Sequence, residues 1–278
     1  MKRISFFAVV VMAVLTSCSK NPANATIEDI QKVCDKEDWG TAKKMCEGYI
    51  MKDKSNPVAF KLLGDAYLGL KDSAFAQYSY DQAVSLDSSY VDAMIGAADI
   101  LMNSGNAPVA IKRLQSQIEA IPDNAKLHNA LGCAFRMTDN DNEAQANFER
   151  AVLLDPNYTL ARKNLAIIQI RNRDLEDAVL NLETVIEETP DQADVYNYLA
   201  LVYVYQHKPN EAEKWFLKAI SVDDKYLTAV ENLAFHYELG GDLVKAKKYY
   251  EKAVALGSES AKEVLKNSKF SNGKQNKK

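Results

Sequence analysis

The chain has 278 residues, of which 47% are hydrophobic and 26% charged, a composition typical of a folded chain and unlike that of a disordered one. Eleven glycines and seven prolines are few for this length and favour helices over a loop-rich β architecture. The formal net charge is −4, so the chain lacks the basic excess that binding to nucleic-acid phosphates requires.

The first 17 residues have the plan of a secretory signal peptide. A basic pair at residues 2–3 precedes an apolar run over residues 4–15, which is too short to span a bilayer but suits a cleaved signal. This run leads into Leu15-Thr16-Ser17-Cys18, which resembles the lipobox of bacterial lipoproteins. The resemblance implies cleavage before Cys18, lipid attachment to its thiol and anchoring by several acyl chains. The alternative is an ordinary signal peptide with a chance cysteine.

The residues after the cysteine indicate a destination. Ser19 is not acidic, which by analogy with envelope sorting rules favours the outer membrane. Residues 19–21 also lack the acidic cluster that resembles a surface-export signal in some lineages. We therefore expect an outer-membrane lipoprotein that faces the periplasm, with residues 18–22 as its lipidated cysteine and tether.

From Ala23 onward the sequence repeats every 34 residues without insertion or deletion. In the second to seventh repeats, a small residue stands twelve positions before a repeated alanine, and a bulky apolar residue stands four positions after it. Small residues let two helix backbones approach closely, and large ones fill the space between them. We therefore expect the alanine column to lie in the helix interface of each hairpin. It consists of Ala42, Ala76, Ala110, Ala144, Ala178, Ala212 and Ala246.

The repeat at residues 125–158 shows the pattern most completely. Its pattern residues are Leu131, Gly132, Phe135, Ala144, Phe148, Ala151 and Pro156. This arrangement resembles the tetratricopeptide repeat, a helix-turn-helix unit. The resemblance implies an all-α fold, a right-handed α-solenoid of seven such repeats over residues 23–260. Neighbouring repeats must stack in it, because a lone hairpin cannot bury its apolar stripe.

The ends of the array differ from its middle. The first repeat has Asp29 and Ile30 where leucine and glycine are expected, a departure that is common in terminal repeats. Residues 261–267 are predicted to form a capping helix. Residues 268–278 are polar and lysine-rich, and they are predicted to be a disordered, solubilising tail. The alternative for this tail is contact with an anionic surface.

The sequence shows no recognisable catalytic or metal site. His128, His207 and His236 lie in different repeats, without cysteine or carboxylate partners at ligand spacing. Neither a glycine-rich phosphate loop nor a Gly-x-Ser-x-Gly elbow occurs. We therefore expect no enzyme activity, no cofactor, no metal and no small-molecule substrate.

Two cysteines of the first repeat could pair. Cys34 ends the first helix of that repeat, and Cys46 lies on the facing helix at a core position. A disulfide between them could form in an oxidising periplasm. The alternative is a pair of free thiols that serve as small core residues.

The family resemblance directs attention to the concave surface, which the first helix of each hairpin lines. Asparagine amides can pair with the backbone of an extended peptide, and tyrosine offers contact area at low entropy cost. The N-terminal part of this surface carries Asp65, Asp92 and Asp99, and Leu201 lies in its C-terminal part. The predicted partner-binding residues are Lys126, Asn129, Arg136, Lys163, Asn164, Arg171, Asn197, Tyr198, Tyr205, Asn232 and Phe235.

Within this set, Lys163 and Arg171 are expected to steer an acidic segment of the partner. The alternative is that the polar residues of the set simply face solvent. The lysine and asparagine clamp that grips chaperone C-termini in some family members does not map onto consecutive repeats here, which disfavours chaperone docking.

Together these features favour a lipid-anchored adaptor that binds protein or peptide partners during assembly of an envelope complex. The membrane is contacted through the N-terminal lipid, and nucleic acid is not an expected partner. A glycan-binding lipoprotein on the same scaffold is the alternative, although such lectins carry long insertions and this chain has none. An enzyme with an unrecognised site is a third hypothesis, which the lack of extra sequence disfavours.

Overall fold

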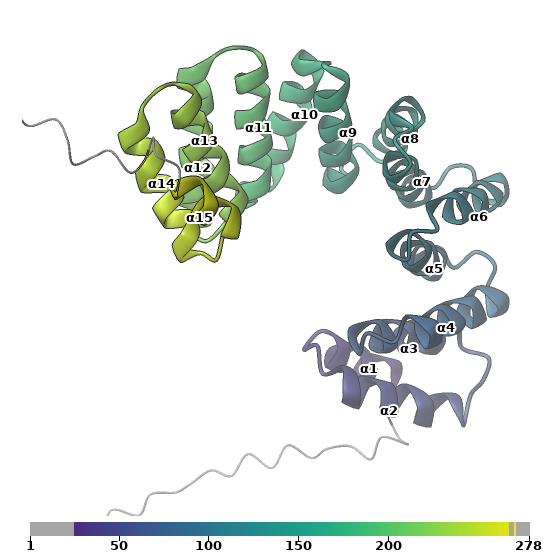
Figure 1. Ribbon diagram of the computed structural model, residues 1–278. Coiled ribbons are helices and arrows are strands. Elements are labelled where there is room, and N and C mark those ends of the chain that lie inside the picture. Colours follow the sequence, from purple (N-terminus) through teal and green to yellow (C-terminus); the bar gives the residue numbers. More distant parts are fainter. Residues whose placement is uncertain (1–24, 267–269, 271–278) are drawn as a thin grey trace, which may run out of the picture. The chain divides into compact units, whose positions relative to one another are not determined.

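The computed structural model describes residues 25–266 and 270 (Figure 1). All regular structure in these residues is α-helical, which confirms the predicted all-α helical-repeat fold. Two helices form each of seven hairpins, and a short fifteenth helix follows. The helices are α1 (Ile27–Cys34), α2 (Trp39–Ile50), α3 (Pro57–Gly69), α4 (Ser73–Leu86), α5 (Val91–Asn103), α6 (Ala107–Ala120), α7 (Ala125–Met137), α8 (Asp141–Leu154), α9 (Thr159–Asn172), α10 (Leu175–Glu188), α11 (Ala193–Tyr205), α12 (Pro209–Val222), α13 (Leu227–Leu239), α14 (Leu243–Ala255) and α15 (Glu259–Leu265).

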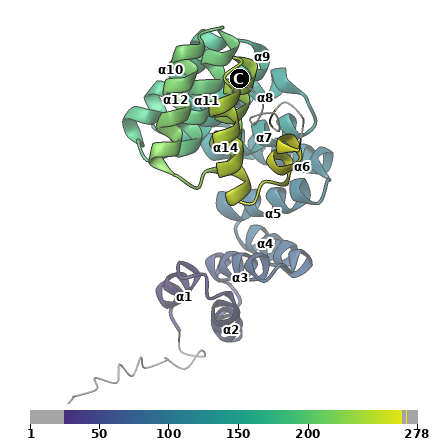
Figure 2. The same ribbon diagram turned by 60° about the vertical axis from the view of Figure 1, so that its left-hand side comes forward.

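The predicted signal peptide, the lipidation site Cys18 and the tether lie outside the described residues. The chain divides into two compact units, residues 1–97 and residues 98–278, with the boundary inside α5. In the first unit, α1 to α4 stack on one another in chain order. In the second unit, each helix from α6 to α15 packs on the next, and α9 to α12 can be followed in both views (Figures 1 and 2).

Every hairpin turns in the same way. In the turn between its two helices, each hairpin has one residue in a left-handed conformation, with φ between 55° and 81°. These residues recur every 34 positions. They are Glu37, Lys71, Gly105, Asp139, Arg173, His207 and Gly241. The next residue is the N-cap of the second helix. It is Asp or Asn in six hairpins and Lys208 in the sixth hairpin. Asp and Asn can satisfy the free backbone N–H groups at a helix start, and Asp38, Asp72 and Asp242 do so here.

Small residues allow the two helices of each hairpin to pack closely. All seven residues of the alanine column are completely buried. One turn after Ala144 on the same helix α8, Phe148 fills the space left by Gly132 on α7, where an added Cβ would lie 2.6 Å from the ring. Tyr80 and Gly64 repeat this arrangement in the first unit, again at 2.6 Å. The helices can approach this closely only because one partner has no side chain at the crossing point.

The C-terminal end departs from the sequence-based expectation in two respects. The capping helix, predicted over residues 261–267, spans Glu259–Leu265, because Ser258 caps it by accepting a hydrogen bond from the Ala261 backbone N–H at 2.9 Å. Phe270 lies in the tail predicted to be disordered, yet it is 4% exposed. Its ring packs edge-on against Tyr250 at a centroid distance of 5.6 Å, since an apolar ring is stabilised by covering the last hairpin.

No helix of the described part combines the length and apolar character that crossing a bilayer requires.

We expect Ala178→Leu to lower the free energy of unfolding by about 1–3 kcal/mol, because Ala178 is completely buried and the added methylenes must enter a closely packed helix interface. Leu180→Ala is a matched control, since Leu180 lies on the same helix and is 63% exposed. Urea denaturation followed by circular dichroism measures both. Equal stability of the wild type, Ala178→Leu and Ala144→Leu would show that these contacts do not limit stability.

Candidate functional site

The eleven predicted partner-binding residues lie on four first helices of the second unit, α7, α9, α11 and α13. Each of these helices contacts the next of the four, so their side chains form one continuous surface. We call this surface the first-helix face. Its structure separates nine of the eleven residues into three groups. Four hydrogen-bonded asparagines form what we call the amide ladder, Lys163 and Arg171 are internally paired cations, and Tyr198, Tyr205 and Phe235 form an aromatic end. Lys126 and Arg136 belong to none of these groups.

The asparagines bind one another. The side-chain amide of Asn164 donates to the Asn129 carbonyl oxygen at 2.8 Å, and that of Asn232 donates to Asn197 at 2.9 Å. Asn129, Asn164 and Asn197 are only 7%, 8% and 1% exposed. The prediction of direct partner contact is corrected for these three residues, because burial and mutual hydrogen bonding leave little of each amide for a ligand. They fix successive repeats in register, and Asn232 alone of the four is partly accessible.

Both predicted steering cations, Lys163 and Arg171, form ion pairs with carboxylates of this chain. The Lys163 ammonium lies 2.8 Å from the Asp194 carboxylate and donates to the Gln192 side chain at 3.1 Å. The Arg171 guanidinium lies 3.0 Å from Asp139 and 3.1 Å from Asp141. The positive charge of each cation and the negative charge of its carboxylate partners largely cancel for a partner protein at a distance. The steering of an acidic partner by Lys163 and Arg171 therefore finds no support in these contacts.

A partly buried ionisable group, Asp99, lies at the start of the second unit. Burial raises the pKa of the Asp99 carboxyl to about 6, and Asp99 forms no ion pair or hydrogen bond within the described residues. Burial also raises the pKa of the nearby Cys133 thiol, which the Arg136 guanidinium lowers and the Asp99 charge raises. The Nε of Arg136 is buried without a partner in the structure. Unpaired groups of this kind are unusual in a purely structural surface.

The C-terminal end of the first-helix face is aromatic and accessible. Tyr205 is 40% exposed and Phe235 is 52% exposed, whereas Tyr198 is partly buried. The Arg173 guanidinium, from the preceding hairpin turn, lies 3.9 Å from the centroid of the Tyr205 ring. Lys126, at the opposite end of the face, is exposed on α7 and has an interaction partner of its own.

A cavity of about 350 Å³ opens beside this aromatic end. Sequence reasoning did not place a cavity here, because its walls come from a hairpin turn and from the end of the next first helix. Its lining residues are Val204, His207, Lys208, Pro209, His236, Leu239 and Gly240.

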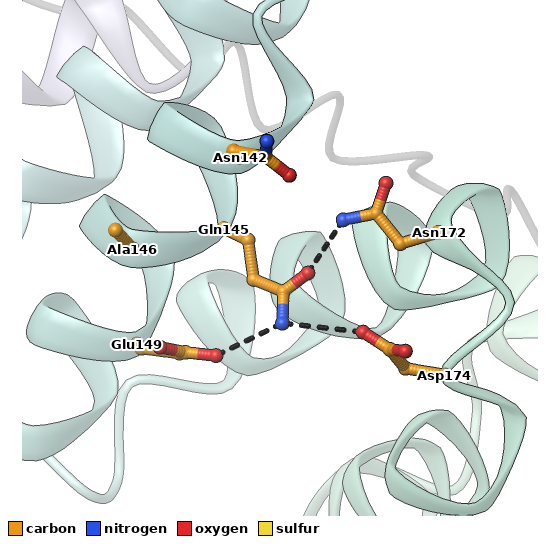
Figure 3. A pocket seen from close by; sticks show the side chains of 6 residues that line it. All are labelled: Asn142, Gln145, Ala146, Glu149, Asn172 and Asp174. Atoms are coloured by element: carbon orange, nitrogen blue, oxygen red, sulfur yellow. Dashed lines mark hydrogen bonds between the residues drawn. The ribbon is translucent and has the colours of Figure 1, made fainter.

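A larger cavity, of about 490 Å³, lies between α8 and the α9–α10 turn (Figure 3). Gln145 stands at its centre and donates to Glu149 at 3.0 Å and to Asp174 at 3.4 Å. Its carbonyl oxygen accepts a hydrogen bond from Asn172 at 2.6 Å. These polar groups satisfy one another across two repeats, so the network explains repeat packing without a ligand.

Cys34 and Cys46 are free, buried thiols in this structure, so the disulfide considered from the sequence is not formed in it. Both pack in the apolar core of the first hairpin with Ile30 and Met45. Burial raises the pKa of Cys34 to about 11 and raises the pKa of Cys46 as well. A protonated thiol is a poor nucleophile, so both side chains act as small core residues. Within residues 25–266 and 270, no group of three or more histidine, cysteine or acidic side chains could hold a metal ion.

Comparison with known proteins agrees with this geometry. Residues 142–202 match one tetratricopeptide-repeat family model, and residues 125–158 and 193–226 match another. Residues 125–226 are therefore similar to tetratricopeptide repeats. A solved tetratricopeptide-repeat protein from Parabacteroides merdae has a similar fold, with a TM-score of 0.65 and 19% identity over 86% of this chain and 96% of that one.

Two sequence relatives match part of the chain. Protein O-mannosyl-transferase TMTC3 of Homo sapiens is 30% identical over 175 residues, which are 62% of this chain and 19% of that protein. Type IV pilus assembly protein PilF of Pseudomonas aeruginosa is 23% identical over 166 residues, 59% of this chain and 66% of PilF. The chain thus spans less than two thirds of each relative's length.

We expect Asp99→Asn to raise the free energy of unfolding at pH 7 by about 1–2 kcal/mol. The folded-state pKa of about 6 lies above the ordinary value of 3.8, so the folded chain binds more protons between these values. Asp99 therefore makes the wild type lose stability as pH rises from 4 to 7. Urea denaturation at several pH values measures this loss of stability. We expect Asp99→Asn to reduce the loss and Asp191→Asn, at an exposed control position, to leave it unchanged. The same pH dependence in all three proteins would contradict the assignment.

Proposed function

We propose that this protein is a lipid-anchored adaptor of the bacterial cell envelope, which holds protein or peptide partners on its first-helix face during assembly of an envelope complex. The observation that carries the proposal is the exposed aromatic end of that face, where Tyr205 and Phe235 are 40% and 52% exposed. Aromatic side chains that stay accessible in a well-packed repeat protein supply much of the binding energy when a partner covers them.

The internal order of the face supports the same role. The amide ladder and the Lys163–Asp194 ion pair connect first helices of successive repeats, and the ion pairs of Arg171 connect α9 to the α7–α8 turn and to α8. The surface is therefore formed before a partner arrives. A preformed surface loses little conformational entropy on binding. PilF, a relative of 23% identity, is named for type IV pilus assembly, which is consistent with an assembly role in the envelope. The transferase activity named for TMTC3 is not carried over, because the match covers only 19% of that protein.

The anchor rests on the sequence Leu15-Thr16-Ser17-Cys18, which ends an apolar run. Lipid on Cys18 would hold the chain at the outer membrane, on its periplasmic side, because several acyl chains at one residue give stable anchoring. The first repeat begins at Ala23, so a tether of a few residues would keep the N-terminal repeats near the bilayer.

We expect Cys18→Ala to remove the protein from outer-membrane fractions, because no acyl chain can be attached without the thiol. Cell fractionation and mass spectrometry of the mature N-terminus measure the change. Cys133→Ala is the control, since it also removes one thiol but leaves the lipobox intact. The anchor proposal fails if Cys18→Ala fractionates like the wild type and no acyl mass is found.

A Tyr198→Ala, Tyr205→Ala double variant should keep its helical content and lose captured partners, because aromatic anchors often contribute about 2 kcal/mol or more each. Cross-linking in intact cells and identification of captured proteins test this, with circular dichroism as the folding check. The matched control is Phe75→Ala, Tyr78→Ala, which removes two rings that are 56% and 60% exposed on α4. Capture that survives the first pair of changes but not the second would move the site to the first unit.

A further inference from the structure

The last two first helices present an apolar strip. Leu201 and Tyr205 lie one helical turn apart on α11, and Phe235 and Leu239 lie one turn apart on the neighbouring α13. Phe235 and Leu239 are 52% and 67% exposed, although other side chains of α11 and α13 are buried in a hydrophobic cluster. We call these four residues the apolar strip.

The strip leads into the cavity of about 350 Å³, because Leu239 belongs to both and Val204 in the cavity wall precedes Tyr205. Pro209 and Gly240 complete the apolar part of the lining. The remaining lining residues, His207, Lys208 and His236, are all nitrogen bases. An apolar surface therefore ends in a cavity whose ionisable groups can become positive but not negative.

The cations around the strip are not neutralised by carboxylates. The Lys208 ammonium donates to the neutral Gln206 side chain at 2.9 Å, and the Arg173 guanidinium rests on the Tyr205 ring at 3.9 Å. Neither forms an ion pair within the described part of the chain, in contrast to Lys163 and Arg171. The imidazoles of His207 and His236 also form no hydrogen bond there.

The cavity wall also contains a residue that is unusual for its position in the hairpin. Lys208 occupies the N-cap position that is Asp or Asn in the other six hairpins. A lysine ammonium has only donors and cannot accept from the free N–H groups of α12, and Asn106, Asn140 and Asp174 make no side-chain cap either. The Lys208 side chain therefore has no capping role and lines the cavity instead.

We propose that the apolar strip and this cavity bind a segment of a partner protein in which apolar side chains stand next to a carboxylate, an inference that rests on the proposed adaptor function. The apolar side chains pack on Tyr205, Phe235 and Leu239. The carboxylate enters the cavity, where Lys208 donates to it, and the charge of Arg173 on the Tyr205 ring of the strip favours an acidic segment. The carboxylate belongs to an Asp or Glu side chain of the partner.

The test is a selection from two random-peptide libraries, one with free C-termini and one with blocked C-termini, on the full-length protein in detergent. We expect enriched peptides to carry apolar residues beside Asp or Glu in both libraries. Binders from the library with free C-termini alone, without Asp or Glu, would show that the chain end supplies the carboxylate and would overturn its assignment to a side chain.

Fluorescence anisotropy with the most enriched peptide then locates its site. Phe235→Ala, Leu239→Ala should weaken binding about thirtyfold, and Arg173→Gln, Lys208→Gln about tenfold. Lys208→Arg should retain binding. Two double variants that change exposed side chains elsewhere in the second unit are matched controls and should leave binding unchanged. For the apolar pair the control is Leu153→Ala, Leu180→Ala, and for the cationic pair it is Lys225→Gln, Lys248→Gln.

A peptide in which the carboxylate is replaced by an amide should bind the wild type about tenfold more weakly, but should bind Arg173→Gln, Lys208→Gln as the acidic peptide does. Circular dichroism excludes unfolding of each variant. Enriched peptides without a carboxylate, or equal binding by variants and controls, would overturn this inference and leave the adaptor function standing. A failure of both libraries to yield any binder would count against the adaptor function as well.

Discussion

The close approach of two helices within each hairpin is the contact on which the rest of the structure depends. Where Gly132 faces Phe148, an added Cβ would lie 2.6 Å from the ring, so the helix spacing is set by a small residue and a large one together. The completely buried alanines provide the same condition in every repeat. Because the hairpins within each unit pack in the same manner, each first helix there is presented in a similar way to its neighbour in the same unit. The continuous first-helix face is a consequence of this packing.

The fold could be predicted from sequence because its determinants are local and repeated. A 34-residue period, an alanine column and, in the second to seventh repeats, a bulky apolar residue four positions later define the hairpin without information about distant contacts. Phe270 shows the limit of this approach. It stands among polar and lysine residues, which predict disorder, but its ring covers the end of the last hairpin and packs on Tyr250. Such a contact depends on which surface remains uncovered after the repeats have stacked.

The candidate site could be predicted only in part. The sequence places Asn129 and Asn197 on the correct helices, but it does not show that each amide accepts a hydrogen bond from an asparagine 35 residues later. It likewise places Lys163 on the face without showing that Asp194 lies 2.8 Å away. Lateral pairs of this kind depend on rotamers and on the offset between neighbouring repeats, which no linear pattern records. The chemical character of the face therefore depends on the groups that remain unpaired after its internal pairs have formed.

Because the hairpins are equivalent, each residue can be compared with the residues at the same position in the other repeats. Seven equivalent turns place a left-handed residue before an N-cap, and six of the N-caps are Asp or Asn. Since all seven second helices begin in the same way, the folding requirement at this position is the same in each. Lys208 is the one N-cap residue of the seven that has no acceptor atom, although Asn106, Asn140 and Asp174 also make no side-chain cap. Capping therefore does not fix the side chain at this position in four of the seven hairpins. In the sixth hairpin a lysine at this position places a donor in the wall of a cavity beside exposed aromatic and leucine side chains, as the proposed binding of a carboxylate requires.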